Sequence, residues 1–139
     1  IKYIIQQDKN TAVKIGRRFR MAWVLDEGLP IYPQLMNEIR RRIVTEVYKA
    51  GDRIPSVREL AAEAEVNANT MQKALSELER EELLVTMRST GRTVTEDVEK
   101  IKSTKKAMAE SEISRCMIYM KELGYSMEEI QSLIAEYKA

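Results

Sequence analysis

The sequence predicts a mainly α fold (α+β), in which several helices are interrupted by one small β-hairpin. Apolar residues recur at steps of three and four along most of the chain, which is the period of an amphipathic helix. Two short segments on either side of residues 89–91 instead suggest strands. Glycine, proline and short polar residues separate these segments and indicate where each one ends.

The first predicted helix follows Gly28 and Pro30 and has roughly four turns. Pro33 suits its first turn, where no amide donor is needed. The turn YKAGDRIP ends the helix, because Gly51 can take a positive φ and Pro55 blocks continuation. Its apolar positions are Tyr32, Leu35, Met36, Ile39, Ile43 and Val47.

The second predicted helix begins in SVRELAAEAEV. Ser56 and Glu59 form a capping box, in which the hydroxyl and the carboxylate satisfy amide donors reciprocally. Leu60, Ala61 and Ala64 make a narrow inward face of small residues, which lets another helix approach closely.

A third helix follows after a few residues, in VNANTMQKALSELEREELL. Asn67 is a good N-cap. Two short helices joined by a tight turn, the second beginning with polar residues, are the helix-turn-helix arrangement. The apolar stripe of this helix consists of Met71, Ala74, Leu75 and Leu78.

The segment LLVTMRSTGRTVTED predicts two short strands around a turn at 89–91, with Arg88 and Arg92 flanking its tip. A helix-turn-helix followed by a basic-tipped hairpin is a winged helix. A polar helix face alone is usually just solvated, and Arg88 and Arg92 alone could be ordinary surface arginines. The order of the parts within about 40 residues therefore carries the prediction of a DNA-binding domain.

A DNA-reading helix inserts its amino-terminal end into the major groove, where amides and hydroxyls can bond to base edges. Asn and Gln suit adenine, and Lys73 suits a guanine or a phosphate. For Thr70 the alternative role is a hydroxyl that supports the first turn of its own helix. The predicted DNA contacts on this helix are Asn67, Asn69, Thr70, Gln72 and Lys73, with Arg88 in the wing.

Composition excludes several other functions. The 139 residues contain no histidine and one cysteine, Cys116, so His-based catalysis, an internal disulfide and a zinc cluster of cysteines are excluded. The chain has no apolar run near the roughly 18 residues of a membrane span and no secretory signal. These features predict a cytoplasmic protein that is not an enzyme and has no cofactor, metal or membrane partner. Its 23 basic and 22 acidic residues nearly cancel, so no global basic field indicates DNA.

The basic residues are concentrated at the amino end, since residues 1–20 hold six basic and one acidic residue. We expect residues 1–20 to be an extension upstream of a native start at Met21, because RRFR is a plausible translation of a ribosome-binding site. The rival hypothesis is a basic arm that enters the minor groove or follows phosphates. The other predicted parts are a DNA-binding domain at 21–95 and a helical dimerisation region at 96–139.

The stretch GDRIPSVRELAAEAEVNANTMQKALSELEREELL resembles the GntR family of bacterial transcription regulators, and the resemblance covers residues 29–95. The matching parts are Pro55 to Ala61, Val66 to Leu75, and Arg88 to Val94. The resemblance implies a dimer that binds double-stranded DNA, at an operator with two-fold symmetry. Carried over by position, the contacts it implies are Arg58, Asn67, Asn69, Thr70 and Gln72, with Thr90 and Gly91 in the wing. Gly91 is also explained as a turn glycine, and both roles are compatible.

The chain departs from the family pattern at several positions. Ala68 and Gln72 stand where arginine is common, so the base preference is expected to lean toward A·T pairs. The other departures together predict a looser wing: Glu82 for a glycine, Ser89 for a wing glycine, Thr93 for a wing aromatic and Ala50 for a proline.

About 44 residues follow the wing and predict a two-helix hairpin, from about Val98 to Leu123 and after Gly124. Ser126 and Glu129 form a second capping box. So small a hairpin cannot enclose a metabolite, and its apolar stripes need a second copy to bury them. The predicted homodimer contacts are Ile101, Met108, Ile113, Met117, Met120, Leu123, Ile130, Leu133, Ile134 and Tyr137.

This hairpin resembles the YtrA-type subfamily, whose short carboxyl-terminal helices hold the dimer together and whose members often sit beside ABC transporter genes. A ligand or metal role for the methionines, and a sensing role for Cys116, are lesser alternatives to packing. Together with the predicted DNA-binding domain, these resemblances imply a sequence-specific repressor that binds a palindromic operator as a homodimer and controls a transporter operon. A small-molecule effector is compatible but unidentified. The alternative is a protein-interaction module built on a winged-helix scaffold.

Overall fold

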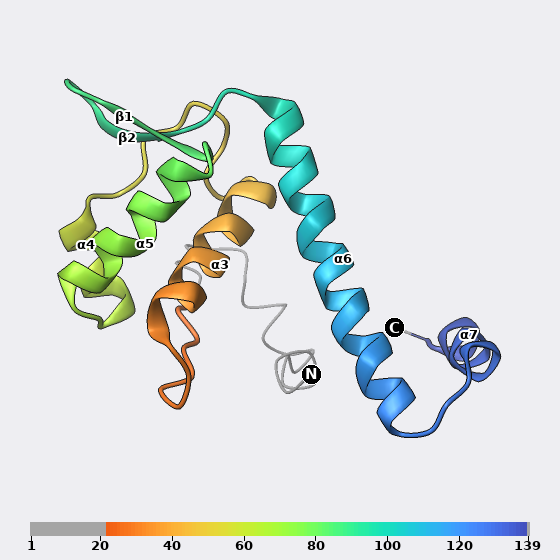
Figure 1. Cartoon of the computed structure of the whole chain (residues 1–139). Coiled ribbons are helices and arrows are strands. Elements are labelled where there is room, and N and C mark those ends of the chain that lie inside the picture. Colours follow the sequence, from red (N-terminus) through yellow and green to blue (C-terminus); the bar gives the residue numbers. More distant parts are fainter. Residues whose placement is uncertain (1–21, 139) are drawn as a thin grey trace.

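The computed structural model describes residues 22–138, so the expectations for residues 1–20 and for Met21 lie outside the described residues. Helices α3, α4 and α5 and one hairpin form a single body, from which α6 leads away to α7 (Figure 1). This confirms a mainly helical fold with a winged helix and carboxyl-terminal helices. The elements are α3 Ile31–Val44, α4 Val57–Ala64, α5 Ala68–Arg80, β1 Leu84–Met87, β2 Gly91–Val94, α6 Val98–Glu122 and α7 Met127–Glu136.

The predicted helix starts are confirmed. Ser56 Oγ accepts from the Glu59 amide at 3.2 Å, while the Glu59 carboxylate accepts from the Ser56 amide at 2.7 Å. These hydrogen bonds lower the pKa of Glu59, and the nearby charge of Arg53 contributes a smaller effect. Ser126 and Glu129 make the same reciprocal pair at the start of α7.

The end of α3 differs from the prediction. The helix ends at Val44, and Val47 is exposed instead of continuing the apolar stripe. Glu46 takes a positive φ of 61°, and the Tyr48 amide donates to the Arg42 carbonyl at 3.0 Å. The backbone thus closes the helix one turn early, which turns Tyr48 back toward it.

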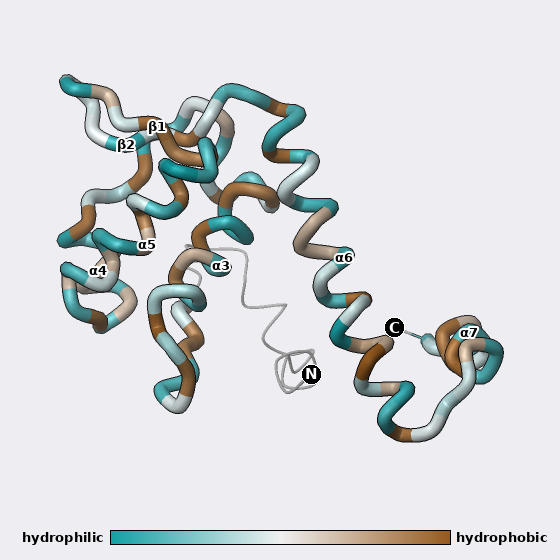
Figure 2. Tube along the Cα trace, in the orientation of Figure 1, coloured by the Kyte–Doolittle hydropathy of each residue, from teal (hydrophilic) through white to brown (hydrophobic). Residues whose placement is uncertain are grey.

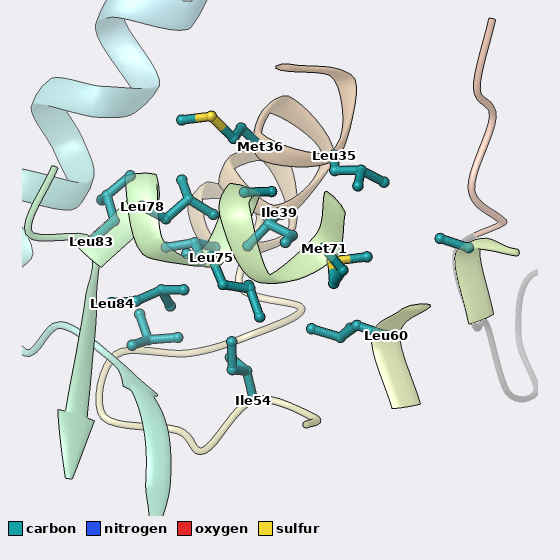
Figure 3. Packing of buried hydrophobic residues seen from close by; sticks show 14 of the residues in the cluster. Leu35, Met36, Ile39, Ile54, Leu60, Met71, Leu75, Leu78, Leu83 and Leu84 are labelled. Atoms are coloured by element: carbon teal, nitrogen blue, oxygen red, sulfur yellow. The ribbon is translucent and has the colours of Figure 1, made fainter. Parts of the chain in front are cut away.

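The hydrophobic core lies between α3, α4, α5 and the base of the hairpin. Leu75 of α5 is fully buried, and side chains from α3, the 51–54 segment and β1 converge around the same helix (Figure 3). Each such side chain contributes about 1.5–3 kcal/mol through burial. The fully buried large residues of this core are Leu35, Ile39, Ile43, Leu60, Met71, Leu75, Leu78, Leu83, Leu84 and Val94.

The segment before α3 is anchored by Trp23, whose ring faces the guanidinium of the buried Arg42 at 4.3 Å. Arg42 also donates to the Tyr48 hydroxyl at 3.0 Å and to Glu38 at 3.0 Å. Burial alone would lower the pKa of Arg42, but the hydrogen bonds that it donates to these two partners, with their charges, raise the pKa overall. The buried charge is therefore well compensated.

The hairpin is antiparallel, with Leu84 opposite Val94 and Thr86 opposite Arg92. Residues 51–54 run along the other edge of β2. The Gly51 amide donates to Val94 at 3.0 Å and the Ile54 amide to Arg92 at 3.0 Å, with an isolated bridge between Arg53 and Thr93. This third short partner of the sheet was not predicted, since only a turn was expected there.

The region after the hairpin has little core of its own. Two helices are present as predicted, but α7 is set apart from α6 and does not lie along it as a tight hairpin (Figure 1). No residue of α6 is fully buried, and Ile130 is the one buried residue of α7. Among residues 22–138, no helix is both long enough and apolar enough to cross a membrane.

Candidate nucleic-acid interface

The amino-terminal end of α5 is exposed and polar. Asn67 caps the helix, because its Oδ1 accepts from the Asn69 amide at 2.7 Å. Asn67, Asn69 and Gln72 are exposed, whereas Met71 and Ala74 are fully buried. The helix is therefore held by its apolar side and presents its amides to solvent, the arrangement that major-groove reading requires.

Three of the predicted DNA contacts on α5 have surroundings within the chain that bear on how their side chains could meet DNA. Gln72 Nε2 donates to Ser76 Oγ at 3.2 Å, an exposed bond that DNA can replace. Lys73 Nζ lies 3.9 Å from the centre of the Tyr32 ring, at the start of α3. This places the charge at the side of α5, which favours a phosphate over a guanine edge. Thr70 is half-buried.

The wing is formed by β1, β2 and their turn, residues 84–94. Arg88 and Thr90 are exposed near its tip, and Gly91 has a φ of +76°, which side-chain-bearing residues rarely adopt. Arg92 is different. Its side chain turns back to α5, where Nε lies 2.6 Å from a carboxylate oxygen of Glu79, and it is only 18% exposed. The prediction that both arginines make the wing tip basic is therefore wrong for Arg92.

Arg53 is a candidate that the sequence reasoning missed. It is exposed, and its guanidinium lies beside Gly91: a Cβ built on Gly91 would be 3.7 Å from Arg53 Nε. The backbone bridge to Thr93 holds it there. The sequence signal was slight, because charged Arg53 beside apolar Ile54 gives only two positions of the alternation that marks a strand.

The arginines of the body fall into two groups. Among the described residues, Arg53, Arg58 and Arg88 are exposed and form no ion pair, and they belong to the 51–54 segment, the first turn of α4 and the wing. The others are paired with carboxylates of their own chain, as in the contact between Arg40 and Glu81. The paired arginines are Arg40, Arg41, Arg42, Arg80 and Arg92. A near-neutral chain can thus still carry exposed arginines that are not held in ion pairs of their own chain.

The predicted dimer contacts are divided by the structure. Ile101 packs against the core of its own chain, and Ile130 is buried within its own chain. Met108, Met117 and Met120 are half-buried. The others remain exposed: Ile113 at 61%, Leu123 at 55%, Leu133 at 40%, Ile134 at 64% and Tyr137 at 72%.

A capped helix with a polar exposed end, backed by two helices and flanked by a hairpin with a glycine corner, defines a winged helix-turn-helix domain of the kind that binds DNA. The sequence model described as "Bacterial regulatory proteins, gntR family" matches residues 31–94. The chain belongs to the GntR family and is a DNA-binding transcription regulator, not an enzyme.

Two relatives from Bacillus subtilis strain 168 are similar over most of their length. The HTH-type transcriptional regulator YhcF is 37% identical over 73% of this chain and 84% of its own. The HTH-type transcriptional repressor YtrA is 32% identical over 79% of this chain and 85% of its own. A solved GntR family regulator from Listeria monocytogenes is 38% identical, with a TM-score of 0.76, over 82% of this chain and all of that one.

Proposed function

We propose that the protein is a repressor that acts in the cytoplasm and binds, as a homodimer, an operator with two-fold symmetry. The observation that carries this proposal is the exposed polar end of α5, together with two exposed arginines, Arg58 in α4 and Arg88 in the wing, that form no ion pair among the described residues. The amides of α5 would read bases, and the arginines would contact phosphates or guanine edges. The similarity to a protein described as the repressor YtrA supports repression and, with the family resemblance, control of a transporter operon.

The homodimer is supported by the far half of α6 and by α7. Figure 2 shows hydrophobic positions along both helices. Several of their apolar side chains are more than half exposed, as Ile113 and Ile134 are. An apolar surface of this extent on two helices without a core of their own is typical of an interface. A second copy of the same region would cover it and would place two copies of α5 on one duplex.

In this mechanism each subunit places α5 in a major groove, and the paired C-terminal regions set the separation of the half-sites. Half-sites about one helical turn apart, roughly 10 base pairs or a multiple, are expected. The bound dimer would block transcription by occupying the promoter. A small-molecule effector is compatible with this mechanism, and we assign it no residues.

Selection of bound sequences from random duplexes tests the proposal. We expect a symmetric consensus, and an affinity that falls steeply as salt rises because bound counterions are released from DNA. The alternative of a protein-interaction module predicts no enrichment and no salt-dependent binding. Sedimentation of the free protein tests the dimer separately, since a monomer at micromolar concentration would contradict it.

A further inference from the structure

Glu79 lies near the carboxyl end of α5 and contacts both strands of the wing. One of its carboxylate oxygens accepts a hydrogen bond from the hydroxyl of Thr86 in β1 and another from Nε of Arg92 in β2, the latter at 2.6 Å. Thr86 and Arg92 are directly opposite each other in the hairpin. A single carboxylate oxygen therefore connects the DNA-reading helix to both wing strands.

This contact is more sheltered than the Arg80–Glu77 ion pair, which also lies near the end of α5. The side chains of Arg92 and Glu79 are 18% and 28% exposed, whereas in the Arg80–Glu77 pair they are 78% and 30% exposed. Charge-assisted hydrogen bonds that are partly withdrawn from water are the stronger ones. The Arg92–Glu79 contact is therefore expected to hold its geometry, whereas the exposed Arg80 side chain is free to move.

The wing needs such an attachment. A two-stranded hairpin is marginally stable alone, and each strand here has four residues. Residues 51–54 support the outer edge of β2, but no strand pairs with the outer edge of β1 among the described residues. Leu84 and Val94 bury its base in the core, but Val85 and Met87 are exposed, so the outer part of β1 has no core contact. Glu79 holds the hairpin midway between that base and the tip.

We propose that Glu79 is a positioning residue that fixes the angle between the wing and α5, so that both reach DNA at once. Glu79 itself touches no DNA in this scheme. The proposal rests on the proposed DNA-binding function. It also opposes the looser wing expected from Ser89 and Thr93, because Arg92 and Thr86 supply an attachment that those departures do not remove.

The sign of the effect separates this role from simple electrostatics. Glu79 is an acidic residue close to the proposed DNA face, so removing its charge should by itself strengthen binding to phosphates. A positioning role predicts the opposite, namely weaker binding, because the wing contacts are lost. Glu77 is a matched control: it is on the same helix, has similar exposure and pairs only with Arg80 among the described residues.

The experiment compares Glu79→Gln with Glu77→Gln in the full chain, on the duplex selected by the wild-type protein at fixed salt. We expect Glu79→Gln to weaken binding about tenfold, the effect of one lost charge-assisted contact. Glu77→Gln should leave affinity unchanged or raise it. In hydroxyl-radical footprints, Glu79→Gln should lose the outer protections made by the wing and keep those made by α5. Unchanged or tighter binding by Glu79→Gln, or equal loss of all protections, would overturn the proposal.

Arg92→Gln and the double variant give a second test. If Arg92 acts through Glu79, the double variant binds no more weakly than the weaker single variant. If Arg92 contacts phosphate independently, the two losses add, which would contradict the proposal. Thr86→Val, which removes only the hydroxyl, replaces Glu79→Gln if that variant does not fold, and should also weaken the wing protections. Failure of the wild-type protein to bind any duplex would instead refute the proposed function itself.

Discussion

Apolar residues are mostly buried in the winged-helix body and mostly exposed in the α6–α7 region. In the body, Leu75 and Leu60 are fully buried in one continuous core, whereas in α6 and α7 residues such as Ile113 and Tyr137 remain exposed. Both regions have helical periodicity and capped helices, so these local features do not explain the difference. The difference lies in the surfaces available for packing. In the body, three helices and the edge of the sheet pack against one another. Beyond its first turns, α6 has no such neighbour among the described residues. The body therefore has a core of its own, whereas the distal helices leave apolar side chains exposed, which is the surface that the proposed dimer would cover.

The largest expected effect is a loss of stability on substitution of a core residue of the body. Leu75→Ala leaves a cavity where the side chain contacts α3 and the hairpin base, so it should lower the free energy of unfolding by about 2–5 kcal/mol. Leu133→Ala, a residue 40% exposed on α7, should cost well under half as much at low protein concentration. Urea unfolding followed by circular dichroism measures both. Equal losses would mean that the two regions form one core.

The second prediction tests the α6–α7 side. Ile134→Glu places a charge on the proposed interface, because Ile134 is 64% exposed in the single chain and would be covered in a dimer. We expect dimer dissociation to become easier by about 2–4 kcal/mol, with unfolding of the body unchanged. Sedimentation across a dilution series measures this. Ser132→Glu adds the same charge to the same helix at an exposed polar position and is the control. If both variants shift the dimer equally, the effect is general charge repulsion and not loss of this contact.

The third prediction concerns DNA binding by the body. Arg58 is exposed in the first turn of α4 and has no carboxylate partner among the described residues. Arg58→Ala should therefore weaken operator binding by at least ~1 kcal/mol at fixed salt. Arg80→Ala removes an arginine that already pairs with Glu77 and should change affinity much less. An unchanged dissociation constant for Arg58→Ala would remove it from the interface.

The features that could be predicted from the sequence are those that depend on interactions between residues within one helical turn of each other. Ser56, Asn67 and Ser126 have the side chains to cap the amides that follow them, and no distant contact changes that. The order of helices and hairpin was predictable for the same reason. The exposed positions on α5 followed from the helical period, because burying Met71 and Leu75 on one side places Asn69 and Gln72 on the other.

The features that were not predicted depend on residues distant in the sequence. Arg92 was expected to flank the wing tip and make it basic, but its side chain turns inward because α5 places Glu79 beside it. Ile101 was expected in the dimer interface, yet the start of α6 crosses α3 closely enough for Ile101 to join the body's core. Periodicity indicates that a side of a helix is apolar, but it does not indicate which surface will cover it.

The smallest expected effect follows from another such distant contact, that of Arg53. Its position beside Gly91 depends on the pairing of residues 51–54 with β2, and it makes no ion pair among the described residues. A phosphate contact there predicts that Arg53→Gln weakens binding to all duplexes by a similar factor and lowers the slope of log affinity against log salt by about 1. Titrations at several salt concentrations, on the selected duplex and on a scrambled one, measure both quantities. A loss confined to the selected duplex would assign Arg53 to a base edge instead. No change in slope would show that the wing, and not Arg53, carries the charge on this side of the body.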